Sequence, residues 1–290
     1  MTIAISLKVN DGVVLAADSA STLVAETAPN VFSVVHIYHY ANKIFNLRKG
    51  FPIGVITWGA GNIGAASIST LVKDLRRRLS GGAEEWRLSD RYTVKEAAEK
   101  FREFMFEETY LPVFKDAEKK PDIGFILAGY SAAEGMAEEY QIDIIGGDCP
   151  EPRLLRPKEQ SGLTWSGEPE AITRLVMGFG VNLPHVLQQN LGVPAAQVDV
   201  AVDVIRQALT IPLVVDAMPI QDAIDLAEFL VDTTIKFSRF TPGPATVGGP
   251  IEIAAISKHE GFKWVRRKHY YHRDMNGEEH EDGAIIKHHG

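Results

Sequence analysis

Thr2 is the first residue of the sequence whose side chain could act as a nucleophile. An initiator methionine is removed when the next side chain is small, so the sequence predicts a mature chain that begins at Thr2. A free N-terminal threonine can attack a carbonyl with its hydroxyl while its own α-amine, with an ordinary pKa of about 7.7 to 8.0, takes the proton. Many intracellular chains begin with Met-Thr, so Thr2 alone does not establish this chemistry.

This chemistry needs a rigid support for Thr2, a cation that lowers the pKa of its amine, and a carboxylate that holds the cation. Ile3–Val9 alternates apolar and polar residues, which predicts a strand directly after Thr2. Asp18 ends the next apolar segment, and Lys43 begins another, so both side chains can reach one edge of a sheet. The alternative is an ordinary surface ion pair.

Along the chain, the elements predicted to position these residues are first strands, then helices, and then strands and helices again. The first two strands, Ile3–Val9 and Val13–Ala17, are joined by the turn Asn10-Asp11-Gly12. Further strands are predicted at Val31–Tyr40, Lys43–Leu47, Ile53–Thr57, Ile123–Tyr130, Glu139–Ile145, Arg153–Arg156, Ile251–Ser257 and Phe262–Val265. Helices are predicted at Ile63–Leu79, Val94–Thr109, Glu168–Val181, Ala195–Leu209 and Ile220–Phe240.

Runs of strands and runs of helices, rather than strict alternation, indicate an α+β fold. We expect two stacked antiparallel sheets with helices on both outer faces. Residues 2–265 are expected to form a single domain, and residues 266–290 a polar C-terminal extension. Thr93 is the expected N-cap of the second helix, with Glu96 completing a capping box and Pro112 lying just beyond the helix end.

Composition excludes several classes of protein. The 290 residues are 45% hydrophobic and carry a net charge of −8, which argues against disorder, nucleic-acid binding and anionic membrane surfaces. No segment reaches the roughly 20 apolar residues of a membrane span, and the first residues do not resemble a signal peptide. The single cysteine, Cys149, excludes an internal disulfide and fits a reducing compartment, so we expect a cytoplasmic protein.

Two sequence patterns suggest other functions, dinucleotide binding and metal binding, and both functions are disfavoured. The segment Trp58–Gly64 contains G-x-G-x-x-G, but no second strand ending in an acidic residue follows about 20 positions later, as dinucleotide binding requires. Most histidines lie near the C-terminus, without the spacing of a metal site. We therefore expect neither a metal nor another cofactor.

Several segments together resemble the catalytic β-subunit of the proteasome. They are Thr2-Ile3-Ala4, the stretch from Asp11 to Thr22, Asn42-Lys43-Ile44-Phe45, Ser166-Gly167-Glu168-Pro169 and Gly248–Ile253. The Ala60-Gly61-Asn62 pattern is similar to that of the bacterial Anbu proteins, which are relatives of the proteasome. The resemblance implies an N-terminal nucleophile hydrolase with a four-layer αββα sandwich.

The resemblance also implies roles for individual residues. Thr2 would be the nucleophile, Asp18 and Lys43 its support, and Ser166 a polar group close to it. A backbone N–H of Trp58 or Gly59 would stabilise the oxyanion. The substrate-binding residues implied are Ser21, Thr22, Ile56 and Ala60, with Thr22 bonding the substrate backbone.

The sequence also departs from this family. Ala20 replaces the family's arginine, and Pro244 and Val247 stand where a polar Asp and Ser are expected. Candidates to replace those two polar groups are Asp232, Ser238 and Thr241. The chain also has about ten extra residues before Lys43 and an extra helix at 184–212.

The sequence predicts a threonine peptidase or amidase acting on peptides or proteins within a homo-oligomer. It does not distinguish a ring from an open helix and identifies no ATPase partner. Two alternatives stay open, namely a structural subunit without turnover and an amidase of non-peptide substrates on the same scaffold.

Overall fold

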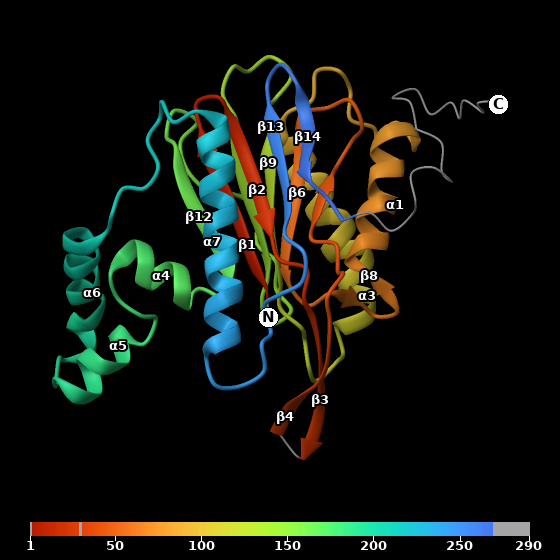
Figure 1. The fold of residues 1–290 in the computed structure, drawn as a ribbon. Helices are drawn as coiled ribbons and strands as arrows, with labels where there is room; N and C mark the ends of the chain where they lie inside the picture. The colour runs from red at the N-terminus through yellow and green to blue at the C-terminus, as the bar shows by residue number, and fades with distance from the viewer. Residues whose placement is uncertain (1, 29–30, 269–290) are drawn as a thin grey trace, which may run out of the picture.

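The computed structural model describes residues 2–28 and 31–268. Two five-stranded antiparallel sheets lie face to face, with helices on the outer face of each (Figure 1). The predicted four-layer αββα sandwich is therefore confirmed. Residues 269–290, most of the predicted extension, lie outside the described residues.

The first sheet contains the strand that follows Thr2. Its strands in spatial order are β12 (Gly162–Gly167), β1 (Ile3–Val9), β2 (Gly12–Ala17), β13 (Glu252–Ser257) and β14 (Gly261–Arg266). Both faces of β1 are buried, because Ile3, Ile5 and Leu7 pack under helices while Ala4 faces the second sheet. A strand in the centre of a sandwich is thus rigid on both sides.

The second sheet faces the first across an apolar layer. Its strands in spatial order are β11 (Arg153–Leu154), β10 (Glu138–Ile144), β9 (Ile123–Gly129), β6 (Ile53–Gly59) and β5 (Ile44–Asn46). The layer between the sheets is built from residues of both, including Leu15, Ile56 and Ile126. Two short hairpins complete the strands, β3 (Ser21–Ala28) with β4 (Val31–Tyr38), and β7 (Asn62–Ile63) with β8 (Ala66–Ser67).

Helices cover both outer faces. The second sheet is covered by α1 (Ile68–Gly81), α2 (Val94–Arg102), the π-helix η1 (Glu103–Tyr110) and α3 (Leu111–Phe114). The first sheet is covered by α4 (Glu170–Met177) and α7 (Ile220–Phe240). The α7 bounds agree with the prediction, because its apolar residues recur at helical spacing.

Three predicted helices have different bounds in the structure. The helix predicted at Glu168–Val181 is α4, Glu170–Met177, which ends where Gly178 adopts a left-handed conformation with φ +76°. The first helix begins at Ile68, since the β7–β8 hairpin occupies residues 62–67 and Ser67 caps the helix by accepting from the Thr70 N–H. The second helix continues beyond Thr109 to Phe114 through η1. Pro112 lies in the first turn of α3, where its missing N–H is tolerated. The Thr93 cap was correct, since its hydroxyl accepts from the Glu96 N–H.

Besides the β7–β8 hairpin, two strands had no counterpart in the prediction. β3 pairs with β4 in a hairpin that projects beyond the sandwich, and β12 pairs with β1 at a sheet edge. Both are partly exposed, so neither has the apolar pattern of a core strand. β12 matters for function because it carries Ser166.

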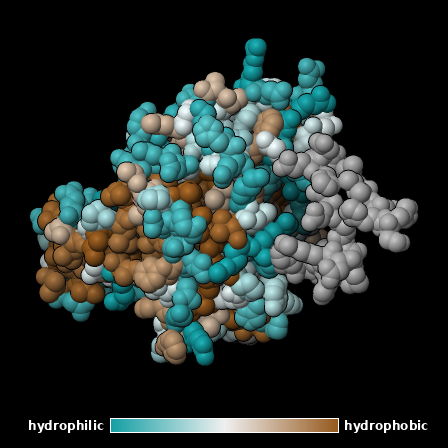
Figure 2. Space-filling view, turned by 45° about the horizontal axis from the view of Figure 1, so that its top comes forward, coloured by the Kyte–Doolittle hydropathy of each residue, from teal (hydrophilic) through white to brown (hydrophobic). Residues whose placement is uncertain are grey.

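A helical arm stands apart from the sandwich at the left of Figure 1. It consists of α5 (Leu183–His185), the π-helix η2 (Val186–Asn190) and α6 (Ala195–Leu209). Large apolar side chains are exposed along it, and Figure 2 shows the brown surface at this side. The exposed ones are Val186, Leu191, Val200, Val204 and Leu209, and Val181 just before the arm is also exposed. Among the described helices, none is long and apolar enough to cross a membrane.

Candidate active site

Thr2 lies immediately before β1 and is 5% exposed. Its carbonyl accepts a hydrogen bond of 2.6 Å from the Glu168 N–H, which ties it to the end of β12. Gly167 has a φ of +98°, and a Cβ there would lie 1.9 Å from the Thr2 carbonyl oxygen. Only glycine fits this approach, so Gly167 and the Glu168 N–H hold Thr2 through backbone geometry.

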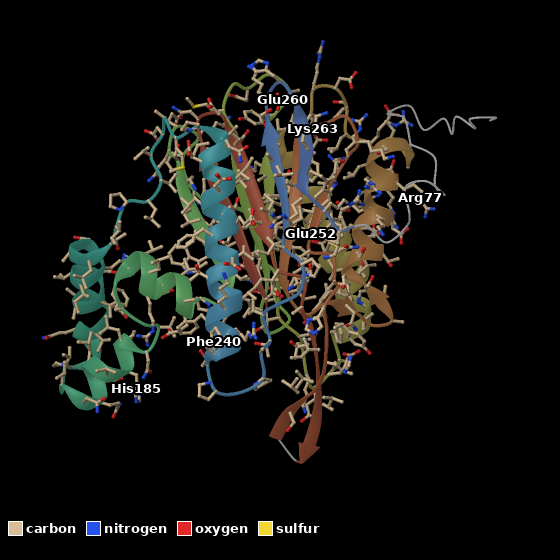
Figure 3. The ribbon with its side chains drawn as sticks, in the orientation of Figure 1. Arg77, His185, Phe240, Glu252, Glu260 and Lys263 are labelled. Atoms are coloured by element: carbon tan, nitrogen blue, oxygen red, sulfur yellow. The ribbon has the colours of Figure 1, made fainter. Side chains whose placement is uncertain are left out.

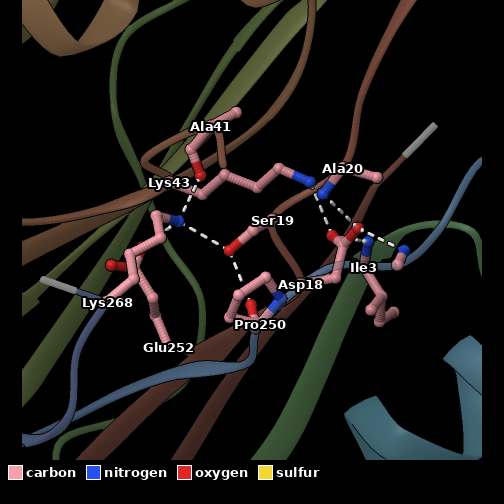
Figure 4. A network of polar contacts seen from close by, with 10 residues as sticks. Ile3, Asp18, Ser19, Ala20, Ala41, Lys43, Pro250, Glu252 and Lys268 are labelled. Atoms are coloured by element: carbon pink, nitrogen blue, oxygen red, sulfur yellow. Dashed lines mark hydrogen bonds and ion pairs between the residues drawn. The ribbon is translucent and has the colours of Figure 1, made fainter. Parts of the chain in front are cut away.

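Asp18 follows β2 and is fully buried. One carboxylate oxygen, Oδ1, accepts from the Ile3 N–H at 3.0 Å and from the Lys43 ammonium at 2.6 Å. The other, Oδ2, accepts from the N–H groups of Ala20 and Gly248, each at 3.0 Å (Figure 4). Four donors from four segments therefore satisfy one buried carboxylate, as a buried charge requires.

Lys43 lies directly before β5 and is 5% exposed. Burial lowers the pKa of its ammonium below the ordinary value, and the Asp18 carboxylate acts in the opposite direction. The Asp18 Oδ1 atom joins this ammonium to the Thr2–Ile3 peptide group. The structure thus brings the three residues Thr2, Asp18 and Lys43 together.

A cavity of about 820 Å³ opens at this point, and both Thr2 and Lys43 line it. Of the predicted substrate-binding residues, Ser21, Thr22 and Ala60 line this cavity. Ile56 does not, because it points into the layer between the sheets and is fully buried.

Ser166 does not line the cavity either. It lies within β12 opposite Ala4, two residues along β1 from Thr2, and it is partly exposed. It is also not the cap of α4, whose N-cap is Pro169. Ser166 is therefore near the start of β1 but on the neighbouring strand.

The backbone of β6 resolves which N–H faces the cavity. The Thr57 N–H donates to the Lys43 carbonyl at 3.0 Å, on the side of β5. Successive N–H groups of a strand point to opposite sides, so that of Trp58 points to β9 and that of Gly59 again to the side of β5. The β5–β6 pairing ends before Gly59, and Gly59 lines the cavity, so its N–H is the available donor.

Gly59 has a structural reason to be glycine. Its φ is +87°, and a Cβ would lie 2.4 Å from the Asp122 carbonyl oxygen. The chain then turns through Ala60, whose N–H donates to the same carbonyl at 3.0 Å. This turn leads into β7 rather than into a helix, so the G-x-G-x-x-G match is not a strand–turn–helix dinucleotide site.

The polar side chains that the resemblance predicts are not supplied by Asp232, Ser238 or Thr241. Asp232 pairs with Lys236 on the surface of α7, and the Thr241 hydroxyl bonds to the Phe237 carbonyl. Neither residue lines the cavity, nor does Ser238. The contacts to Asp18 come instead from backbone N–H groups, including that of Ala20.

Residues that sequence reasoning missed lie behind this site. Ser19 donates to the Pro250 carbonyl at 2.6 Å, and Lys268 reaches Ser19, Ala41 and Glu252. The sequence offered one signal, the match at Gly248–Ile253, but nothing in it linked that segment to Lys268. In the described part of the chain, no group of three or more His, Cys, Asp or Glu side chains could hold a metal ion. The clustered histidines from His269 onward lie outside the described residues.

No protein-family model matches this sequence, and no curated protein sequence matches it either. Among solved structures, the chain is similar to an Anbu variant from Hyphomicrobium sp. strain MC1, with a TM-score of 0.51 and 16% sequence identity. That match covers 92% of this chain and 86% of the other. An Anbu protein (ancestral beta-subunit) from Yersinia bercovieri has a TM-score of 0.47 and 14% identity, covering 92% and 88% of the two chains. The chain therefore has the αββα fold of the Anbu proteins, the fold of the proteasome-like N-terminal nucleophile hydrolases.

Proposed function

We propose that the chain is an amide hydrolase that uses Thr2 as its nucleophile after removal of Met1. One observation carries this proposal: the buried Asp18 carboxylate binds both the Lys43 ammonium and the Ile3 N–H at the wall of a cavity that Thr2 lines. A buried cation beside a terminal amine favours the neutral form of that amine at neutral pH. The amine can then accept a proton.

The proposed reaction has two halves. In the first, the Thr2 hydroxyl oxygen bonds to the substrate carbonyl carbon and its proton passes to the Thr2 α-amine. The Gly59 N–H donates to the oxyanion that forms. The carbon–nitrogen bond then breaks, the leaving amine takes the proton, and an ester to Thr2 is left.

In the second half, water attacks this ester. The Thr2 amine accepts the proton of the water and returns it to the threonine oxygen as the ester bond breaks. The product is a carboxylic acid, and the enzyme is restored. Throughout, Asp18 holds Lys43 in place, and Lys43 maintains the electrostatic field at the amine.

We infer that the substrates are peptides. The cavity is lined by Ser21 and Thr22 of β3 and by the turn Gly59–Gly61, and an extended peptide can bind along a strand in this way. The exposed apolar surface of the arm supports a further proposal, that copies of the chain assemble with one another.

Mass spectrometry and inhibitor labelling test the nucleophile. We expect the purified protein to lack Met1, to hydrolyse a fluorogenic peptide, and to form one covalent adduct on Thr2 with a peptide epoxyketone. Thr2→Ala should abolish hydrolysis and labelling, while Thr2→Ser, the matched control, keeps part of both. Turnover that is unchanged in Thr2→Ala would overturn the proposal.

A structural subunit without turnover is the second candidate. It is favoured by Val247, which stands where the resemblance predicts serine and is 2% exposed in the apolar layer under α7. For this candidate we expect an intact Met1 and no adduct. The same mass spectrum therefore distinguishes the two functions.

A further inference from the structure

A second buried ion pair lies behind the Asp18–Lys43 pair. Lys268 and Glu252 are 8% and 1% exposed, and their charged atoms are 2.9 Å apart. Figure 3 shows Glu252 in the interior of the molecule at the start of β13, whereas Lys263 on β14 lies near the surface. The proposed reaction uses neither member of this pair.

The Lys268 ammonium contacts three segments of the chain. It donates to the Ser19 hydroxyl at 2.6 Å and to the Ala41 carbonyl at 2.5 Å, and it pairs with Glu252 (Figure 4). An ammonium has three donor hydrogens, so these three acceptors match its full capacity. Ser19 is adjacent to Asp18, and Ala41 is two residues before Lys43.

Glu252 depends on this lysine. Its Oε2 atom is buried and accepts no hydrogen bond of good geometry from any described group. The Lys268 ion pair therefore balances its charge. Removing that partner would leave a buried carboxylate close to the site, with an electrostatic effect on the groups there.

We propose that Lys268 is a positioning residue of this active site, which holds the Asp18 and Lys43 segments together while its charge and that of Glu252 offset each other. The inference rests on the proposed function, since it assigns this pair a role in the Thr2 reaction. It also extends the functional part of the chain to Lys268, beyond the last strand of the sheet.

The electrostatic part of the inference concerns Lys43. Asp18, Lys268 and Glu252 are the charged groups that act on its pKa, with Lys268 lowering it and Glu252 raising it. Tyr38, His39 and Tyr40 are the other titratable side chains that line the cavity. Losing the Lys268 charge should raise the pKa of Lys43 and of the Thr2 amine, because the opposing Glu252 charge stays.

Three variants separate the positioning effect of Lys268 from the effect of its charge. Lys268→Met removes the cation, Glu252→Gln removes the anion, and the double variant removes both while keeping similar volumes. Peptide hydrolysis is measured from pH 5.5 to 9.5, and the pKa of Lys43 is followed by the ¹³Cε NMR shift in lysine-labelled protein, assigned with Lys43→Arg. The folded fraction of each variant is measured by circular dichroism.

We expect Lys268→Met to lower kcat roughly tenfold with little change in KM, because the acting groups shift while the cavity wall stays. The acidic limb of its pH–activity profile should move to higher pH by about half a unit or more, and the pKa of Lys43 should rise. The double variant should return the limb and the Lys43 pKa close to those of the wild type. Glu252→Gln should move both downward.

Arg156→Met is the matched control, because Arg156 pairs with the buried Glu139 away from the cavity. It should destabilise the protein without moving the pH profile. If Lys268→Met behaves in the same way, with an unchanged profile and Lys43 pKa, the positioning role is wrong. If the wild type neither hydrolyses peptide nor labels at Thr2, the proposed function fails, whereas the NMR titration still reports on the Lys268–Lys43 coupling.

Discussion

Two similar buried ion pairs lie along β1, and of the two only Asp18–Lys43 lies beside the cavity that Thr2 lines. At the start of β1, Asp18 binds Lys43 at 2.6 Å. At the middle of β1, the Ser6 hydroxyl donates at 2.6 Å to Glu139, which is also fully buried and pairs with Arg156 at 2.8 Å. Both pairs combine a fully buried carboxylate with a largely buried cation.

The two pairs differ in the groups that donate hydrogen bonds to the carboxylate. Glu139 is held by side chains alone, a hydrogen bond from the Ser6 hydroxyl and an ion pair with the Arg156 guanidinium. Asp18 receives three backbone N–H groups as well as Lys43, so the ammonium can lie at the cavity wall next to Thr2. A buried ion pair is therefore not a site in itself, and becomes one only beside a nucleophile and an open cavity.

Substitution of Lys43 should have the largest effect on catalysis and so tests the difference between the two pairs most directly. We expect Lys43→Ala to reduce peptide hydrolysis about a hundredfold or more, because the Thr2 amine loses its cationic neighbour and becomes protonated at neutral pH. The fold should survive, since Asp18 keeps its three backbone donors. Steady-state kinetics and urea unfolding measure the two effects, and activity above a tenth of wild type would contradict the role of Lys43.

The opposite result is expected at the other pair. Arg156→Met leaves the buried Glu139 charge without its cation, so the free energy of unfolding should fall by about 3–5 kcal/mol. Hydrolysis per folded molecule should stay within about twofold, because Arg156 does not line the cavity. Urea unfolding provides the measurement, and a large loss of kcat would show that the two ion pairs are coupled.

The Gly59 N–H is the proposed oxyanion donor at the cavity, and a substitution at Gly59 tests this role. Gly59→Ala should lower kcat about tenfold to a hundredfold, because a Cβ at φ +87° meets the Asp122 carbonyl and moves the N–H. Gly50→Ala is its matched control, since Gly50 also has a positive φ, +78°, but nothing lies near the added Cβ. The control should lose some stability and keep its kcat. Equal kinetics of the two variants would reject Gly59 as the donor.

The smallest effect concerns Cys149, a buried group that belongs to neither pair. Burial raises the pKa of its thiol from 9.0 to about 11, with the Arg102 guanidinium acting in the opposite direction. The stability gained by keeping the thiol protonated is fully present below pH 9 and is lost as the pH rises through 11. Unfolding free energies from pH 8 to 11 should therefore fall less steeply in Cys149→Ala, with catalysis unchanged. Parallel curves would contradict this.

Much of the fold could be predicted from particular elements. β1 and α7 have the predicted bounds, because an alternating strand and a long amphipathic helix each carry their own periodic pattern. β12 could not be predicted, since an edge strand with partly exposed residues has no such pattern. For the same reason Ser166 could not be placed before its strand was known.

The candidate site was predictable in part. Thr2, Asp18 and Lys43 come together as predicted, but the sequence left both Trp58 and Gly59 open as donors. The pairing of Thr57 with Lys43 decided between them, because it sets the direction of every N–H along β6.

By itself, the sequence determined the strands that support Thr2, the acid and the cation beside it, and the layered α+β class. These follow from local patterning, which is written in neighbouring residues. Only the tertiary structure decided that Ile56 faces the core, that Gly248 supplies a backbone donor, and that Lys268 supports Ser19 from 249 positions away. Contacts of that kind depend on how separate segments pack against one another, and no local pattern encodes them.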